Sequence, residues 1–242
     1  MKKITVINGS CRHHGNTQCL IDSFLEQLSP LIGTCSIIEF NPDSVDLRPS
    51  KKPEDSFYLG ADLLERDQID DSSKIKEMME QSDLIVFASP TYFANVSAFM
   101  KLFVDRFCHL THLFYFAGKP AVVIATSDGR GHTQVLNYLR QFATGLGMNV
   151  AGELCSSGSS LSDNSHTRQV AISVAKRLEG EDRCIETGGD LEASFLLWKR
   201  IISSRTEDDY EKRYWQDSGL INCNSLSEYI AISSTAQRKC RA

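Results

Sequence analysis

The sequence predicts an α/β fold: a doubly wound, five-stranded parallel sheet with helices on both faces. Short apolar or β-branched runs alternate with longer helical segments along residues 1–180. Two of these runs, residues 84–88 and 121–125, are apolar at every position. Such uninterrupted runs are typical of strands covered on both faces, because helices pack on each side of a parallel sheet.

The individual elements follow from their periodicity. Phe99, Phe103 and Phe107 recur every four residues, which places three rings on one face of a helix. The expected strands are 4–7, 36–40, 84–88, 121–125 and 148–154. The expected helices are 17–28, 72–81, 96–110, 132–145 and 163–179.

Two regions depart from this alternation. Residues 41–71 contain prolines and many charges, so we expect an irregular connection there. Beyond residue 185, apolar residues predict one more helix, and the polar, Ser-rich end predicts a frayed tail. We therefore expect one domain over residues 1–185 and an extension over 186–242 that packs on the core or on a partner subunit.

Composition excludes several classes of function. The chain has 242 residues, of which 41% are hydrophobic, and a formal net charge of −5. The hydrophobic share is ordinary for a globular protein, and the negative charge disfavours a nucleic-acid partner, which needs a basic face. No apolar run approaches the ~20 residues of a membrane span. The N-terminus lacks the pattern of a signal peptide, so we expect a cytoplasmic protein without a membrane partner.

Cysteine and histidine spacing gives no metal site. The eight cysteines are widely spaced and form no C-x-x-C pair, so neither a disulfide framework nor a zinc cluster is expected. His109 and His112 stand three residues apart, a spacing that can share a metal ion. They lack a third ligand in register, and we interpret them as a solvated helix end or as lid residues.

The residues after each strand are the first candidates for a site, because doubly wound folds bind ligands at the carboxyl ends of their strands. A polar turn bracketed by Gly9 and Gly15 follows the first strand and leads into a helix. Unpaired backbone N–H groups and the helix dipole favour phosphate there. The candidate phosphate ligands are Ser10, Arg12, Asn16 and Thr17.

The glycine spacing of this turn limits which class of phosphate ligand it can bind. A P-loop has four residues between its glycines and then a lysine, whereas here five residues separate Gly9 from Gly15 and Asn16 follows. The G-x-G-x-x-G dinucleotide fingerprint is absent as well. A monophosphate with no obligatory metal remains.

Two further polar loops are expected at the same edge. Residues 89–95 follow the third strand and include Tyr92 and Phe93, and the glycine-rich residues 126–132 follow the fourth strand. Three such loops together can hold a phosphate, a polar chain and a flat heteroaromatic ring.

These motifs resemble a known family. Over about residues 1–180, the sequence is similar to the NADPH-dependent FMN reductases of the flavodoxin-like superfamily, including NAD(P)H-dependent flavin oxidoreductases and iron–sulfur flavoproteins. The motifs that carry the resemblance are Gly9-Ser10-x-Arg12-x-x-Gly15-Asn16-Thr17, Ser89-Pro90-x-Tyr92 and Lys101-x-x-x-Asp105-Arg106.

The resemblance implies a flavodoxin-like fold, bound FMN, NAD(P)H as electron donor, and a homodimer or homotetramer. The implied phosphate ligands are Ser10, Arg12, Asn16 and Thr17. The implied ring contacts are Pro90, Thr91, Tyr92, Phe93 and Asn95 on one side, with Ser127, Asp128, Gly129 and Gly131 closing the other. Because the cofactor carries the chemistry, no catalytic side chain is assigned. The implied acceptor is a quinone, a flavin, a nitro- or azo-aromatic compound or a metal oxyanion.

One departure from the family and two alternatives follow. Iron–sulfur members carry a compact cysteine cluster, but this chain has no cysteine from residue 36 to 107, so we predict no iron–sulfur cluster.

An electron-carrier flavoprotein with an acidic docking face is one alternative function, and direct reduction by NAD(P)H would exclude it. A flavin-dependent tailoring or regulatory protein that docks a partner through residues 187–242 is the other.

Overall fold

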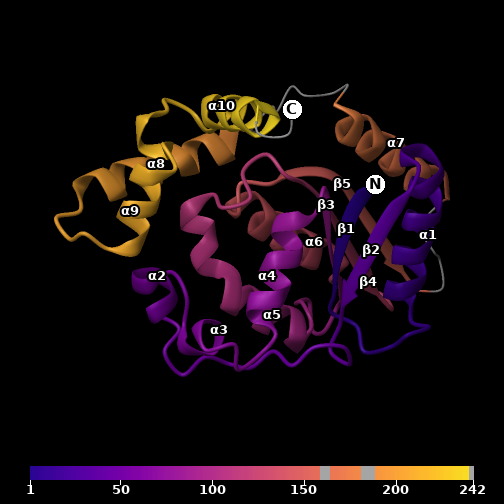
Figure 1. The fold of residues 1–242 in the computed structure, drawn as a ribbon. Helices are drawn as coiled ribbons and strands as arrows, with labels where there is room; N and C mark the ends of the chain where they lie inside the picture. The colour runs from indigo at the N-terminus through magenta and orange to yellow at the C-terminus, as the bar shows by residue number, and fades with distance from the viewer. Residues whose placement is uncertain (159–163, 181–188, 240–242) are drawn as a thin grey trace.

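The computed structural model describes residues 1–158, 164–180 and 189–239 (Figure 1). Within these residues, five parallel strands form one sheet in the order β2-β1-β3-β4-β5. The strands are β1 (Lys2–Asn8), β2 (Cys35–Phe40), β3 (Leu84–Pro90), β4 (Pro120–Ser127) and β5 (Asn149–Ser157). This strand order is that of flavodoxin-like sheets, so the predicted fold class is confirmed.

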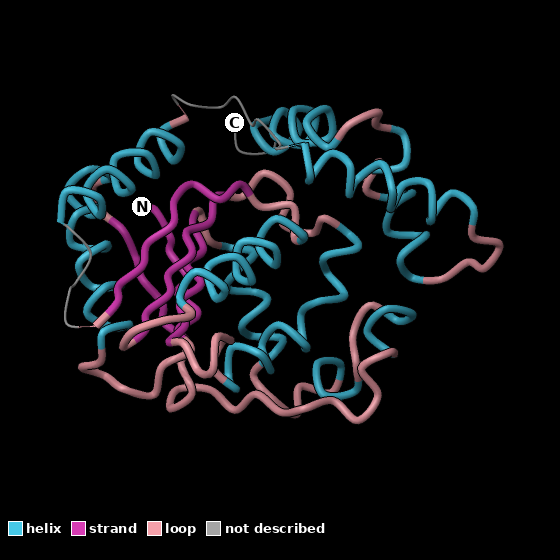
Figure 2. The backbone as a smooth tube through the Cα atoms, turned by 180° about the vertical axis from the view of Figure 1, so that it is seen from behind, coloured by secondary structure: helices cyan, strands magenta, loops and turns pink. Residues whose placement is uncertain are grey.

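Helices cover both faces of the sheet, as Figure 2 shows from behind. One face carries α1 (Asn16–Ile32) and α7 (Asn164–Glu179), and the other carries α4 (Ser72–Gln81), α5 (Ala98–Phe107) and α6 (His132–Gly145). Each face has its own apolar core. All residues of β3 from Leu84 to Ser89 are buried, which explains why this strand is apolar without interruption.

The connection between β2 and α4 is more ordered than its composition predicts. It contains two short helices, α2 (Asp55–Leu59) and α3 (Leu63–Arg66). Asp62 caps α3 by accepting a hydrogen bond from the Glu65 amide at 3.0 Å. The buried Arg106 of α5 pairs with Asp62 at 3.1 Å and with Asp70, so long-range ion pairs fix a segment that has little apolar patterning.

The C-terminal segment packs on the core through α8 (Gly189–Ser204), α9 (Tyr210–Asp217) and α10 (Leu226–Lys239). The rings of Phe195 and Trp215 are buried in the same cluster as the side chains of α4 to α6. These helices lie away from the carboxyl ends of the strands in both views (Figures 1 and 2). The expected boundary at residue 185 lies outside the described residues.

Two sequence expectations are wrong here. The predicted frayed tail is helical up to Lys239, and Leu226 and Ile230, one helical turn apart, anchor this helix in the core; residues 240–242 lie outside the described residues. The predicted solvated helix end is a buried 3-10 turn, η1 (Cys108–Leu113), that lies against the C-terminal helices. The apolar period continues across α5 into this turn, while the C-terminal helices that cover it come from distant sequence.

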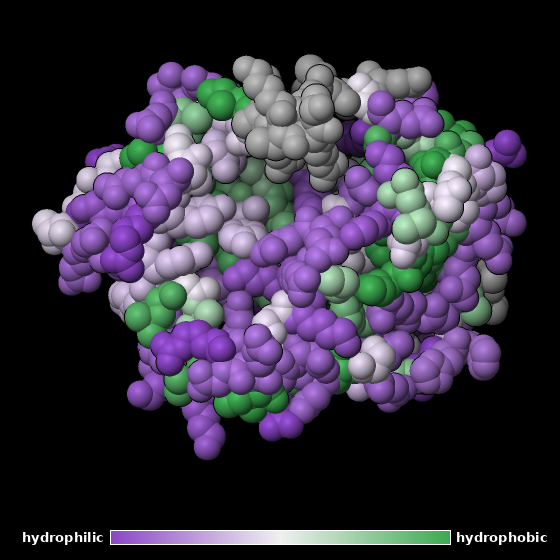
Figure 3. All heavy atoms as spheres, viewed as in Figure 1, coloured by the Kyte–Doolittle hydropathy of each residue, from purple (hydrophilic) through white to green (hydrophobic). Residues whose placement is uncertain are grey.

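The surface is mostly hydrophilic on the face seen in Figure 3, with hydrophobic side chains in separate patches. Single exposed apolar side chains are normal on a folded protein. Among the described residues, no helix is long and apolar enough to cross a membrane.

Candidate functional site

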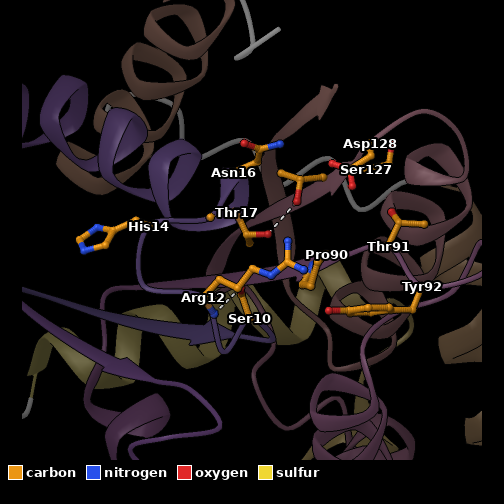
Figure 4. Close-up of a pocket in the computed structure, with 12 residues that line it drawn as sticks. Ser10, Arg12, His14, Asn16, Thr17, Pro90, Thr91, Tyr92, Ser127 and Asp128 are labelled. Atoms are coloured by element: carbon orange, nitrogen blue, oxygen red, sulfur yellow. Dashed lines mark hydrogen bonds between the residues drawn. The ribbon is translucent and has the colours of Figure 1, made fainter. Parts of the chain in front are cut away.

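A cavity of about 550 Å³ opens where β1, β3 and β4 end (Figure 4). Three segments far apart in sequence form its wall, as the parallel topology requires. The lining residues are Ser10, Arg12, His14, Gly15, Asn16, Thr17, Pro90, Thr91, Tyr92, Thr126, Ser127 and Asp128.

The turn between β1 and α1 provides one end of the cavity. The Asn8 Oδ1 atom accepts a hydrogen bond from the Ser10 amide at 3.0 Å, and the Ser10 hydroxyl accepts one from the Arg12 amide at 3.1 Å. Gly15 stands at the N-cap of α1 in an extended conformation, and as a glycine it has no side chain to accept from the first amides of the helix. This end therefore offers N–H donors together with the positive end of the helix dipole.

Arg12 adds a free positive charge to this end. Within the described residues, its guanidinium makes no ion pair or hydrogen bond, and it projects into the cavity (Figure 4). His14 also lines this end. The neighbouring His13 instead pairs with Asp43 at 3.3 Å.

Thr17 connects the part of the cavity formed by α1 to the part formed by β4. Its side chain is buried, and its hydroxyl shares a hydrogen bond with the Thr126 hydroxyl at 2.7 Å, drawn as a dashed line in Figure 4. This bond links the first turn of α1 to the end of β4. Thr126 was not among the predicted site residues, although its place at the end of a predicted strand was a usable signal.

The loop after β3 forms the opposite wall. The Thr91 amide donates to the Thr126 carbonyl at 2.7 Å, whereas the Thr91 hydroxyl is buried and has no hydrogen-bond partner among the described residues. A buried hydroxyl without a partner costs free energy unless a ligand completes it. The Tyr92 ring extends along this wall (Figure 4) and is 56% exposed.

The end of β4 completes the cavity. The Ser127 hydroxyl is buried and lies 3.0 Å from Nδ1 of His132, the first residue of α6. Asp128 follows it at the rim and lies away from Arg12 in Figure 4. Positive charge is therefore concentrated at the α1 end and negative charge at the β4 end.

Most of the predicted site residues meet in this cavity. They are Ser10, Arg12, Asn16, Thr17, Pro90, Thr91, Tyr92, Ser127 and Asp128. Four others, Phe93, Asn95, Gly129 and Gly131, are not among the lining residues. His14, Gly15 and Thr126 line the cavity without having been predicted.

Gly131 affects the cavity through the shape of its loops. It precedes α6 at a φ of 96°, and a Cβ atom there would lie 2.9 Å from the Ala94 Cα and from the Thr91 Cγ2. Only glycine permits both this φ and this close approach. The loop after β4 can therefore pack directly on the loop after β3.

A second cavity of about 770 Å³ lies between α2 and the C-terminal helices. Its wall contains the carboxylates of Glu54, Glu207, Asp209 and Glu211 but only one arginine, Arg205, which pairs with two of them. An excess of carboxylates repels phosphate, so the first cavity fits a phosphate-bearing ligand and the second does not.

The histidines near the second cavity are structural. His112 pairs with Glu211 at 2.8 Å and stacks on Trp198 with ring centroids 3.7 Å apart. His109 is buried, and this burial lowers its pKa to about 4. Among the described residues, no group of three His, Cys, Asp or Glu side chains could hold a metal ion.

Comparison with known sequences gives related proteins. A family model described as NADPH-dependent FMN reductase matches residues 2–159. An iron–sulfur flavoprotein of Archaeoglobus fulgidus is 27% identical over 237 residues, covering 91% of this chain and 100% of that protein. A putative NAD(P)H-dependent FMN-containing oxidoreductase of Bacillus subtilis is 28% identical over 188 residues, covering 73% of this chain and 96% of that protein.

Solved structures share the fold. RosB, solved with 8-demethyl-8-formylriboflavin-5′-phosphate, gives a TM-score of 0.60 at 12% identity and covers 87% of this chain and 90% of its own. An azoreductase from Bacillus anthracis gives a TM-score of 0.51 at 13% identity, covering 74% of this chain and 97% of its own. At these identities the likeness shows a common fold.

Proposed function

The chain belongs to the NADPH-dependent FMN reductase family, as an oxidoreductase with FMN as cofactor and NAD(P)H as electron donor, and we propose that it reduces a small acceptor by way of FMN. The proposed acceptors are quinones, flavins and nitro- or azo-aromatic compounds. In the balanced reaction with a quinone, NAD(P)H loses a hydride and becomes NAD(P)⁺. The quinone gains that hydride equivalent and one proton from solvent, and becomes the hydroquinone.

The observation that best supports this proposal is a cavity in which two polar side chains lack protein partners among the described residues. Within the described residues, the Arg12 guanidinium is unpaired and the buried Thr91 hydroxyl has no hydrogen-bond partner. The first turn of α1 adds amide donors. This donor set fits a monophosphate joined to a polar chain, which is the chemistry of FMN.

In this proposal, the phosphate lies at the α1 end of the cavity. Arg12 supplies charge, and the α1 amides with Ser10, Asn16 and Thr17 supply donors. Asp128 repels an anion from the other end, so the polarity of the cavity orients the cofactor phosphate toward Arg12.

The loops after β3 and β4 would hold the ring. Pro90, Thr91 and Tyr92 offer a wall on one side, and Ser127 and Asp128 offer polar groups on the other. The turn residue Asn95 and Gly131 shape these loops without lining the cavity, and Gly129 does not line it either. Bound FMN supplies two-electron chemistry, and the protein supplies position and hydrogen-bond donors.

Assembly is a further part of the proposal. The family resemblance favours a homodimer or homotetramer of a domain over residues 1–185 with an extension over 186–242. Multi-angle light scattering of the purified holoprotein tests this, and a monomer mass would refute it.

A visible spectrum before and after anaerobic NADPH tests the function directly. A flavin spectrum that bleaches within seconds supports the oxidoreductase. A flavin spectrum that persists contradicts direct reduction and favours the electron carrier. A colourless protein that does not take up added FMN contradicts the assignment of the cavity.

A further inference from the structure

A turn beside the cavity adopts a backbone conformation that its residues disfavour. Phe93 has a φ of 48° and Ala94 a φ of 59°, between the flanking residues Tyr92 and Asn95. Positive φ at both central residues is the signature of the type I′ turn, which normally takes Gly, Asn or Asp there. Side chains with a Cβ resist this region, so the surrounding structure must impose it.

The turn is fixed at its base. Tyr92 and Asn95 exchange backbone hydrogen bonds with N···O distances of 2.9 and 3.0 Å. Just beyond the turn, the Ser97 amide donates to the Ser89 hydroxyl at 3.0 Å, which joins the end of the loop back to β3. The loop that carries Phe93 is therefore preorganised.

This preorganisation leaves one aromatic ring entirely in solvent. The Phe93 side chain is fully exposed, at 105% of its reference area, whereas the adjacent Tyr92 is half exposed and lines the cavity. An exposed phenyl ring on a disfavoured backbone gives this chain no packing energy in return. Strained residues of this kind gather at functional sites, so the ring points to a contact outside the chain's own core.

We propose that Phe93 is the stacking platform for the electron acceptor and that this acceptor is a planar aromatic molecule, an inference that rests on the proposed function. Phe93 directly follows the cavity-lining Tyr92 in sequence, and both side chains are exposed. A phenyl ring has no hydrogen-bonding group, so it recognises a ligand by apolar area and ring stacking. This chemistry suits quinones and nitro- or azo-aromatic compounds, and it gives a metal oxyanion nothing to bind.

The test compares Phe93→Gly with Phe93→Tyr. Glycine removes the ring and also suits a positive φ, so this variant keeps the turn. Tyrosine keeps a ring. The matched control is Tyr58→Ala, which removes a half-exposed aromatic residue of α2 that does not line the cofactor cavity. Each holoprotein is assayed with NADPH and either a naphthoquinone or ferricyanide, a non-aromatic acceptor.

We expect Phe93→Gly to raise the KM for the naphthoquinone about ten-fold, the effect of one lost aromatic contact. The KM for ferricyanide changes by less than about two-fold, and Phe93→Tyr and Tyr58→Ala stay near the wild type. Calorimetric titration of the oxidised holoprotein with the naphthoquinone shows the same ten-fold weakening, without NADPH.

Three results would overturn the inference. The first is a naphthoquinone KM that does not rise in Phe93→Gly, and the second is a ferricyanide KM that rises with it. The third is a changed particle mass in light scattering, which would assign Phe93 to a subunit contact. Failure of NADPH to bleach the wild-type flavin would contradict the proposed function instead, and the calorimetric titration would still decide the role of Phe93.

Discussion

Replacing Arg12 with alanine should weaken FMN binding about ten-fold while leaving the fold intact. The guanidinium projects into the cavity and is unpaired within the described residues, so its removal strands no buried partner. A hydrogen bond to a charged group is worth about 1.5–3 kcal/mol. Because Arg12 is exposed and water screens its charge, we take about 1.5 kcal/mol, which corresponds to about ten-fold in Kd.

The assay is fluorescence titration of the apoprotein with FMN and, in parallel, with riboflavin. Riboflavin has no phosphate, so the Arg12→Ala variant should bind it as tightly as the wild type does. Arg12→Lys keeps the charge and should recover part of the FMN affinity. Arg200→Ala, which removes an exposed arginine of α8, serves as the matched control for a lost surface charge.

Two results would refute this reasoning. If Arg12→Ala changes the Kd for FMN by less than about two-fold, the phosphate lies elsewhere. If it weakens riboflavin equally, Arg12 contributes to the shape of the loop and not to phosphate recognition.

Three further predictions address the loops, the core and the missing cluster. Gly131→Ala should lower stability by about 1–3 kcal/mol, because φ is 96° and the new Cβ would lie 2.9 Å from the Ala94 Cα. Urea unfolding with FMN titration checks this, and an unchanged midpoint would contradict it. His109 has a pKa of about 4 in the folded state against 6.5 when unfolded, so unfolding takes up a proton between these values. Stability should therefore fall as the pH drops from 6.5 to 4, by up to about 3 kcal/mol, and His109→Leu should remove that part of the pH dependence; identical pH profiles would refute the assignment. Protein purified anaerobically should contain no stoichiometric iron or acid-labile sulfide, because residues 36–107 include no cysteine; several irons per chain would overturn this.

The fold was predictable because its signals are local. The uninterrupted apolar runs at β3 and β4 and the aromatic spacing along α5 give period and burial within a few residues. The short helices α2 and α3 were not predictable in this way. Arg106 pairs with Asp62, which caps α3, and with Asp70, 44 and 36 residues away, while Phe57 of α2 packs on His109 and His112; no local pattern encodes contacts of that range.

Much of the candidate site was predictable because each of its loops can be recognised separately in the sequence. Each loop follows its own strand, and the parallel topology brings the strand ends together without further information. Three residues that line the cavity were missed: His14, Gly15 and Thr126. The Thr126 hydroxyl hydrogen-bonds with that of Thr17, 109 residues away. Nothing near residue 126 in sequence announces that partner.

Phe93 shows a different limit. The family resemblance implied a contact between Phe93 and the cofactor ring, but the direction of its side chain depends on a positive φ that phenylalanine rarely adopts. The ring consequently faces solvent beside the cavity instead of lining it. A local propensity that is overruled by the fold is itself a signal of function, because such strain persists only where the structure imposes it.

The two parts of the site differ in how narrowly they select a ligand. At the α1 end, charge, helix dipole and several directed donors converge, and each demands an anion of definite shape. On the loop after β3, the exposed Phe93 ring offers apolar area without hydrogen bonds. A ligand that lacks the phosphate loses several interactions at once, whereas an altered aromatic acceptor loses only part of one contact. The enzyme should therefore discriminate more sharply among flavins than among acceptors.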